Sequence, residues 1–149
     1  MASVALPDGV AVQARALGAA RYRQQPSFGV YLCGRRSRRR VARGWTGTWR
    51  AIWLDWPPLG LPADSSATVA ALVEAHVRAA RGEQVEIACT SGRSRTGTAL
   101  AALAVRAGLD TDEAVAWVRS AYPPARIVTR RQRRWLGEWA AELRRAVPV

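Results

Sequence analysis

The chain has 149 residues, 49% of them apolar, which is enough for one well-packed core but not for two. Its 23 basic residues are all arginine and oppose 11 acidic residues, so the formal net charge is +12. Because alanine is abundant as well, the arginine content indicates a GC-rich coding bias, and charge alone does not make the chain a nucleic-acid-binding protein.

Strand patterns dominate the first part of the chain. Residues 10–17 alternate apolar and polar side chains after the turn Pro7-Asp8-Gly9, and residues 28–32 and 48–56 are rich in aromatic and branched residues. We expect an opening hairpin or edge pair. The run Arg35-Arg36-Ser37-Arg38-Arg39-Arg40 is interpreted as a solvated loop, with attraction of anionic substrates and nucleic-acid contact as alternatives.

Helical patterns dominate the remainder. Residues 65–80 carry apolar side chains on one helical face, and residues 85–88 form a short apolar strand. Residues 98–107 are almost wholly apolar and predict a buried helix, followed by helices at 110–122 and 130–146. Together these elements predict a single α/β domain over all 149 residues, with a central, mostly parallel, twisted sheet flanked by helices.

The apolar strand leads directly into a thiol, a short loop and an arginine. Cys89 and Arg95 have Cys-x5-Arg spacing, which by chance occurs in roughly one such arginine-rich chain in three. Gly92, Thr96 and Gly97 extend the pattern to Cys-x2-Gly-x2-Arg-Thr-Gly, and the chance of the whole pattern falls to the order of 2 in 10,000. The full pattern is therefore specific.

The chemistry of this loop favours phosphate. A loop between a strand end and a helix start can turn backbone N–H groups inward and add the positive helix N-terminus, which makes a cradle for a dianion and favours a thiolate at Cys89. Arg95 can hold two phosphoryl oxygens, and Thr96 can donate its hydroxyl to the thiolate. Glycines allow positive φ or close approach of the backbone to the anion. We expect the rest of the loop to bind phosphate, namely Thr90, Ser91, Gly92, Arg93, Ser94 and Gly97.

The loop resembles the active-site loop of the protein tyrosine phosphatase superfamily, in its compact dual-specificity branch. More narrowly, residues 28–139 resemble small phosphatase-like proteins of high-GC actinobacteria, through Trp56-Pro57, Gly60-Leu61-Pro62-Ala63-Asp64, the Cys89 loop and Gln132-Arg133-Arg134. The resemblance implies a phosphatase that acts on phosphotyrosine, or also on phosphoserine and phosphothreonine, through a cysteinyl-phosphate intermediate. It implies that Arg95 binds phosphate and that Thr96 aids departure of the thiolate. We expect no cofactor.

Two positions depart from the family pattern. Ala88 stands where the family usually has a histidine, and Pro58 stands where a Trp-Pro-Asp loop supplies the general acid. Asp55 is our candidate acid and Asp64 a weaker one, each only if the loop adopts a shifted register. Otherwise Asp64 is a helix N-cap and Asp55 a solvent-facing strand end. A catalytically weak, phosphate-binding pseudophosphatase is therefore the alternative function.

Three further polar residues have two interpretations each. The resemblance assigns Gln132 to positioning of the hydrolytic water, whereas helix periodicity alone places it on the exposed face of residues 130–146. Cys33 is expected as a strand-end thiol packed like a small apolar side chain, with a reversible disulfide to Cys89 as the alternative. His76 lacks partners at metal-ligand spacing, so we expect it to be structural and expect no metal site.

The expected partner is a phosphorylated protein or a small phosphate ester, and the sequence does not identify which ester or which oligomeric state. Sulfur transfer and arsenate reduction are other chemistries of a Cys-x5-Arg loop. Nucleic acid is the least favoured partner, because no helix-turn-helix, zinc or RNA-binding motif accompanies the arginines. No charged N-terminal segment precedes an apolar run and no stretch could span a bilayer, so we expect a cytoplasmic protein without a membrane partner.

Overall fold

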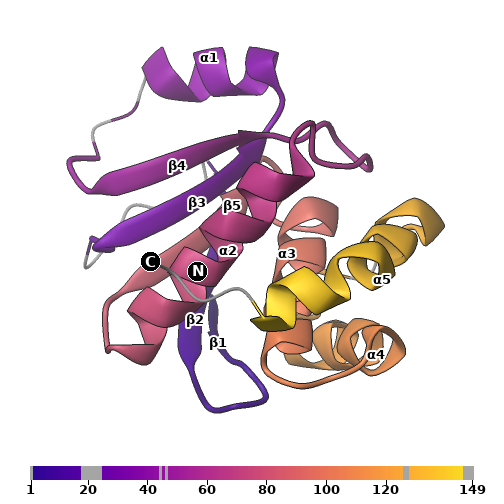
Figure 1. Cartoon of the computed structure of the whole chain (residues 1–149). Helices are drawn as coiled ribbons and strands as arrows, with labels where there is room; N and C mark the ends of the chain where they lie inside the picture. Colours follow the sequence, from indigo (N-terminus) through magenta and orange to yellow (C-terminus); the bar gives the residue numbers. More distant parts are fainter. Residues whose placement is uncertain (1, 18–24, 44, 46, 126–127, 146–149) are drawn as a thin grey trace.

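A computed structural model describes residues 2–17, 25–43, 45, 47–125 and 128–145. Within these residues one five-stranded sheet has the order β1-β2-β5-β3-β4 (Figure 1). Only the edge pair of β1 and β2 is antiparallel, and the other neighbours are parallel. The strands are β1 (Ala2–Ala5), β2 (Ala11–Ala16), β3 (Phe28–Cys33), β4 (Arg50–Asp55) and β5 (Val85–Cys89). The predicted α/β fold with a mostly parallel sheet is confirmed.

The opening hairpin is closed by a short turn. Leu6 N–H donates to the Val10 carbonyl and Gly9 N–H donates to the Leu6 carbonyl, both at 2.8 Å. Asp8 Oδ1 accepts a further hydrogen bond from Val10 N–H at 3.1 Å. The sequence predicted an opening hairpin or edge pair but assigned no strand before residue 10, because the four residues of β1 include two alanines and give little strand signal.

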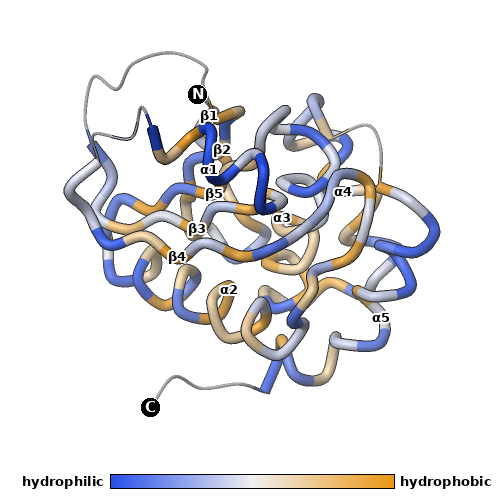
Figure 2. Tube along the Cα trace, turned by 90° about the horizontal axis from the view of Figure 1, so that it is seen from above, coloured by the Kyte–Doolittle hydropathy of each residue, from blue (hydrophilic) through white to orange (hydrophobic). Residues whose placement is uncertain are grey.

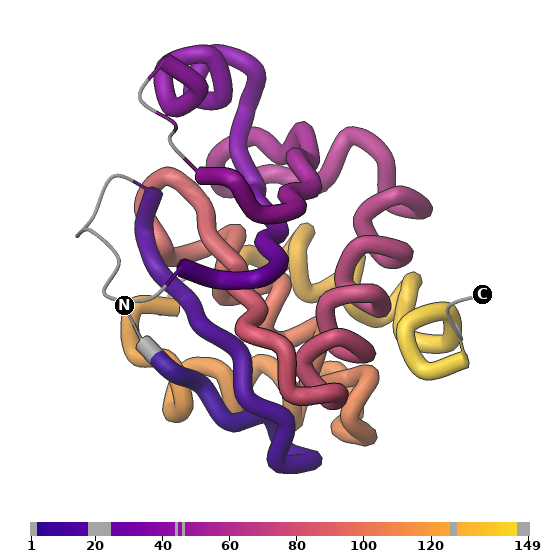
Figure 3. The backbone as a smooth tube through the Cα atoms, turned by 90° about the vertical axis from the view of Figure 1, so that its left-hand side faces the viewer, coloured from indigo at the N-terminus to yellow at the C-terminus, as the bar shows by residue number. Residues whose placement is uncertain are grey.

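The two faces of the sheet are covered by different parts of the chain. Alternate residues of a strand point to opposite faces. On one face, Leu32, Leu54 and Ile87 belong to the main core, which α2 (Ser65–Ala80), α3 (Ser94–Arg106), α4 (Thr111–Ala121) and α5 (Arg130–Arg145) complete. On the opposite face, called the second face below, Tyr31, Cys33 and Ala88 pack together. Four partly buried side chains cover them, namely Val41, Trp45, Trp49 and Trp53. Figures 1 and 3 show α1 apart from the other four helices.

The arginine run is a helix, so its interpretation as a loop is wrong. α1 spans Arg35–Arg43 and buries none of its residues. Arginine has a good intrinsic helix propensity, and one side of α1 touches the protein. Val41 packs against the aromatic residues of the second face, and Arg38 Cζ lies 5.8 Å from the centroid of the Trp53 ring.

The helices on the main face follow the predicted pattern. Asp64 caps α2, its Oδ1 accepting from Ala67 N–H at 3.0 Å. Helix α4 begins with a capping box formed by Asp110 and Glu113. Helix α3 begins at Ser94, four residues before the predicted start, and every residue from there to Val105 is buried. This buried helix therefore joins the Cys89 loop to the centre of the core.

None of the helices within the described ranges combines the length and the apolar character that crossing a membrane requires.

Candidate active site

Cys89 lies at the carboxyl end of a central strand. β5 pairs with β2 on one side and β3 on the other, with Leu32 as the register partner of Cys89. Four residues, 90 to 93, connect β5 to α3. The Cys89 carbonyl accepts a hydrogen bond from Leu17 N–H at 2.8 Å, and its side chain is fully buried. The carboxyl ends of parallel strands are where open α/β sheets bind ligands.

Three predicted catalytic residues are placed around this strand end. Thr96 Oγ1 lies 3.0 Å from Cys89 Sγ and is oriented to donate its proton. Arg95 is only 4% exposed, and its Nη1 donates to the Trp56 carbonyl at 3.0 Å. No carboxylate in the described part of the chain forms an ion pair with Arg95. A buried cation without a counter-charge is costly, so this position favours an anionic ligand.

Gly92 is held between two parts of the protein. Its φ is +65°, and a Cβ there would lie 2.6 Å from Ala16 N and 2.8 Å from the Arg15 carbonyl carbon. Only glycine fits without moving β2. On the other side, the Tyr122 hydroxyl donates to the Gly92 carbonyl. Burial, together with the nearby Cys89, raises the pKa of Tyr122 to about 12, so the hydroxyl remains a donor near neutral pH.

Gly97 lies at a close packing contact between α3 and Ala125. It lies inside α3, outside the positive-φ region, and its N–H already donates to the Arg93 carbonyl at 2.7 Å. A Cβ at this position would lie 2.4 Å from Ala125 Cβ. Close approach of α3 to Ala125 is therefore one reason for a glycine here, and phosphate binding by Gly97 stays a prediction.

The other loop residues divide by exposure. Thr90, Ser91 and Arg93 are exposed, whereas Ser94 is buried. The Ser94 hydroxyl donates to Gln132 Oε1 at 2.9 Å, so it is committed to the protein. Phosphate binding by Thr90, Ser91, Gly92, Arg93 and Ser94 stays a prediction.

Gln132 joins three segments of the site. It is completely buried, so the alternative that placed it on an exposed helix face is wrong. Its Oε1 accepts from Ser94 Oγ and from Thr129 N–H at 3.0 Å, and its Nε2 donates to the Gly60 carbonyl at 3.1 Å. Thr129 Oγ1 in turn accepts from Gln132 N–H at 3.1 Å, which gives the start of α5 a capping-box arrangement. The predicted water-positioning role stays a prediction.

The segment after β4 closes over Arg95. Trp56 is fully buried, its Nε1 donates to the Gly60 carbonyl at 2.8 Å, and its ring centroid lies 5.7 Å from that of Trp135. Gly60 N–H donates to the Pro57 carbonyl at 3.1 Å and closes a turn. Leu59, at the tip of this turn, has φ +57° and is 56% exposed. The turn is thus fixed in shape beside Arg95.

No family model and no curated protein sequence matches the chain. Solved structures do match it. Human DUSP28 has a TM-score of 0.67 at 16% identity, over 95% of this chain and 97% of that one. Tk-PTP in its active form has a TM-score of 0.61 at 23% identity, over 83% of this chain and 81% of that one. PTPMT1 in complex with PI(5)P has a TM-score of 0.60 at 16% identity, over 79% of this chain and 78% of that one. The chain has a dual-specificity phosphatase fold.

In this phosphatase fold, neither candidate acid is brought to Cys89. Asp64 caps α2. Asp55 is the register partner of Cys33 and so shares its face of the sheet, whereas Cys89 and its partner Leu32 lie on the other face. The 42% exposed Asp55 side chain pairs with Arg35, with Oδ2 3.5 Å from Arg35 Nε. The geometry therefore does not support Asp55 as the general acid.

Cys33 is buried at the end of β3, as expected for a packed thiol. It is free, as is Cys89, and the sheet separates the faces on which the two side chains lie. Burial raises the pKa of the Cys33 thiol above its usual value. A disulfide between the two cysteines would require rearrangement of the strand ends.

His76 has the structural surroundings predicted for it. Its Nε2 lies 2.7 Å from Asp8 Oδ2, and its Nδ1 accepts from Arg106 Nε at 3.0 Å. This contact ties the hairpin turn to α2 and α3. Across the described residues, no group of three His, Cys, Asp or Glu side chains is arranged to hold a metal ion.

A buried polar network supports the Cys89 loop from the second face of the sheet. Arg15 on β2 forms an ion pair with Glu86 on β5, and both side chains are buried. Glu86 Oε2 accepts from the Tyr31 hydroxyl at 2.7 Å, which accepts from Trp49 Nε1 at 2.7 Å. Burial and the neighbouring Glu86 raise the pKa of Tyr31 far above its usual value. Because the backbone of β2 at Arg15 and Ala16 packs directly against Gly92, the network that fixes Arg15 also positions the loop, although it does not contact it.

Proposed function

We propose that the chain is a cysteine-dependent phosphatase that hydrolyses phosphate monoesters, with phosphotyrosine in proteins as its substrate. One observation carries the proposal. Arg95 is buried and has no carboxylate partner among the described residues, and the adjacent Thr96 donates to Cys89 Sγ. A phosphoryl dianion would supply the missing counter-charge, and the thiol would stand in position to attack it.

The reaction has two steps. The Cys89 thiolate attacks phosphorus, an S–P bond forms, and the P–O bond to the leaving group breaks. Water then attacks the phosphocysteine, and inorganic phosphate and the thiolate are released. Arg95 would stabilise the charge on the phosphoryl oxygens in both steps, and Thr96 would stabilise the departing thiolate.

The choice of phosphotyrosine follows from the missing acid. Pro58 has no proton to give, and Asp55 and Asp64 are engaged elsewhere. The leaving oxygen must then depart with little help from the protein. A phenol such as tyrosine has a pKa near 10 and leaves far more readily than a serine or threonine alkoxide. We therefore expect the rate to fall steeply as the leaving group becomes more basic.

The test is steady-state hydrolysis of an aryl phosphate across pH, with vanadate as inhibitor. We expect vanadate-sensitive turnover that Cys89→Ser abolishes and that Arg95→Ala lowers by about 10²–10³-fold, the scale on which loss of one transition-state donor acts. Cys33→Ser is the matched control and should retain activity. Turnover that survives in Cys89→Ser would refute the proposal.

A catalytically weak, phosphate-binding module is the second candidate. It is favoured by Pro58 at the acid position together with the pairing of Asp55 with Arg35. Such a module would bind a phosphotyrosine peptide in an Arg95-dependent manner, without turnover above the Cys89→Ser background. Measuring peptide binding and product release on the same folded, reduced protein separates the two functions.

A further inference from the structure

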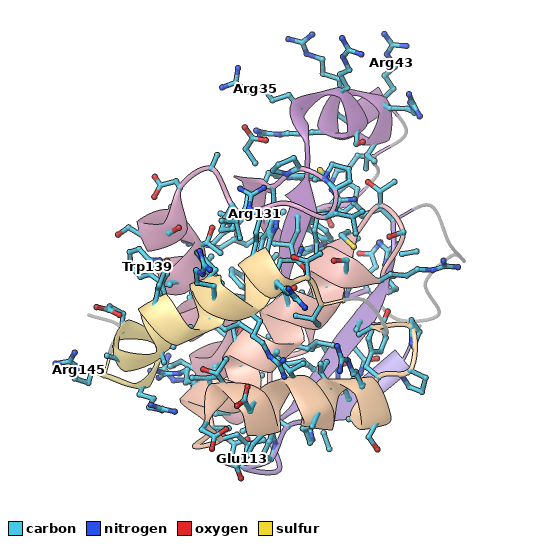
Figure 4. All side chains as sticks on the ribbon, turned by 90° about the vertical axis from the view of Figure 1, so that its right-hand side faces the viewer. Arg35, Arg43, Glu113, Arg131, Trp139 and Arg145 are labelled. Atoms are coloured by element: carbon cyan, nitrogen blue, oxygen red, sulfur yellow. The ribbon has the colours of Figure 1, made fainter. Side chains whose placement is uncertain are left out.

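Helix α1 concentrates positive charge to an extent that the fold does not require. Six of its nine residues are arginine, its first turn contains no acidic residue, and all six arginines are exposed. Figure 2 colours this helix mostly as hydrophilic, and Figure 4 shows Arg35 and Arg43 pointing away from the body of the protein. Only Ser37 and Val41, one turn apart, are half-buried against the protein.

Most of this charge is not neutralised. Arg35 pairs with Asp55, and Arg38 lies over Trp53. Among the described residues, Arg36, Arg39, Arg40 and Arg43 have no acidic partner. Six arginine pairs in α1 stand three or four residues apart, at 35–38, 36–39, 40–43, 35–39, 36–40 and 39–43, where like charges oppose helix formation. A bound polyanion would relieve this repulsion.

The position of α1 connects it to the Cys89 site. It begins two residues after β3 ends, at the same edge of the sheet as Cys89, because Leu32 is the register partner of Cys89. Its first residue, Arg35, forms an ion pair with Asp55. The carbonyl of the residue after Asp55, Trp56, accepts a hydrogen bond from Arg95. A ligand that leaves the Cys89 site, crosses the carboxyl ends of β3 and β4 and passes Asp55 on the second face would therefore meet the arginines of α1.

The observations favour a polypeptide as this ligand. A helix that lies in a membrane interface needs a free apolar face, and the half-buried side of α1 already contacts the protein. Arginines alone would give a nucleic acid only phosphate contacts and no link to Cys89. A nine-residue helix is about 13 Å long, the span of about four residues of extended chain. Guanidinium groups bind carboxylates and phosphates well.

We propose that α1 binds an acidic stretch of about four residues, flanking the phosphorylated residue in the protein substrate. This inference rests on the proposed phosphatase function, since it places the rest of the same substrate. The interaction would lower KM and leave kcat nearly unchanged, because α1 does not touch the reacting atoms. It would also weaken with salt, since the arginines are exposed.

The test uses phosphotyrosine peptides that differ only in four flanking residues, all glutamate or all glutamine, placed before or after the phosphotyrosine. The α1 variant replaces Arg36, Arg39, Arg40 and Arg43 with glutamine, which preserves helix propensity and the contacts of Arg35 and Arg38. The control variant replaces four exposed arginines elsewhere with glutamine and so carries the same net charge, namely Arg81, Arg119, Arg134 and Arg145.

At low salt we expect the wild type and the control to favour the better-placed glutamate peptide by about tenfold in kcat/KM, through KM. The α1 variant should reduce this preference to about twofold or less, with unchanged turnover of a small aryl phosphate. Absence of the preference in the wild type, its survival in the α1 variant, or its equal loss in the control would overturn the proposal.

Failure of the phosphatase function is visible separately, as absent turnover of the aryl phosphate by the wild type. Fluorescence anisotropy with labelled glutamate and glutamine peptides then tests α1 alone, and the same tenfold ratio is expected in Kd. Two competitors test the type of ligand: a 20-base-pair DNA duplex and phosphatidylcholine vesicles containing PI(5)P. Tighter α1-dependent binding to either one than to the glutamate peptide would overturn the assignment to a polypeptide.

Discussion

Replacing Gly92 with alanine should damage both the stability and the activity of the protein. The added Cβ would lie 2.6 Å from Ala16 N and 3.0 Å from Ala16 Cα, and these are backbone atoms that cannot rotate away. Left-handed φ costs an alanine about 1–2 kcal/mol, and forcing extra volume into a packed site costs about 1–3 kcal/mol. We therefore expect the free energy of unfolding to fall by about 2–5 kcal/mol.

Gly82 provides a matched control. It also has positive φ, +89°, but a Cβ there would meet nothing within 4 Å. Gly82→Ala should therefore lose only the conformational part, about 1–2 kcal/mol. The difference between the two variants in the free energy of unfolding, measured with urea, gives the cost of the steric overlap between the added Cβ at position 92 and β2.

Activity should separate the same two variants. A shift of about 1 Å in a catalytic loop can cost on the order of 10² in rate, so we expect that loss in aryl phosphate hydrolysis for Gly92→Ala, and a change within about twofold for Gly82→Ala. If the two variants unfold at the same urea concentration and turn over the substrate equally, Ala16 does not restrict the side chain at position 92.

Three other predictions concern Tyr122, Gln132 and Asp55. Tyr122→Phe should lower stability by about 1 kcal/mol near neutral pH by removing the bond to Gly92. The pKa of Tyr122 is raised to about 12 in the fold, so its contribution is full below pH 10, where the unfolded chain begins to ionise, and is lost by about pH 12. Urea unfolding at several pH values should therefore show a smaller alkaline loss in Tyr122→Phe than in the wild type. Gln132→Ala should cost about 2–4 kcal/mol in urea unfolding because it leaves several buried groups unpaired, whereas the exposed Arg134→Ala should stay within about 0.5 kcal/mol. Asp55→Asn should change kcat for an aryl phosphate less than about twofold, and a tenfold fall with loss of the acid-side pH dependence would restore Asp55 as the general acid.

Local signals in the sequence were enough for much of the fold. Asp64 as an N-cap, the buried strand before Cys89 and the apolar helix after it all depend on neighbouring residues, and the structure contains each of them. The same holds for the short distance between Thr96 and Cys89, because a strand, a four-residue loop and a helix fix it within one segment.

Contacts between distant segments could not be read in the same way. Tyr122 bonds to Gly92, 30 residues away in the sequence, and Gln132 bonds to Gly60, 72 residues away. No local sequence pattern predicts either contact. A signal did exist for the start of α5, because Thr129 and Gln132 have the spacing of a capping box. What it could not show is that neighbouring segments enclose the glutamine completely.

At the arginine run, local preferences are balanced, and a contact with another part of the protein stabilises the helix. Arginine favours a helix, while repulsion between arginines one turn apart opposes it. The contact of Val41 with the aromatic side chains of the second face gives α1 an anchor that the sequence does not reveal. The same limit applies to Glu86, whose charge within a buried strand signals a partner without identifying Arg15.

The aromatic cluster beneath α1 also acts as a built-in optical probe. Trp45 lies with its ring centroid about 5 Å from those of Tyr31, Trp49 and Trp53, at angles between 66° and 76°, a spacing at which excited states couple. Because Arg38 stands over Trp53, a ligand that pulls on the arginines of α1 would alter the emission and near-ultraviolet dichroism of these rings. Occupancy of α1 can therefore be followed without a label.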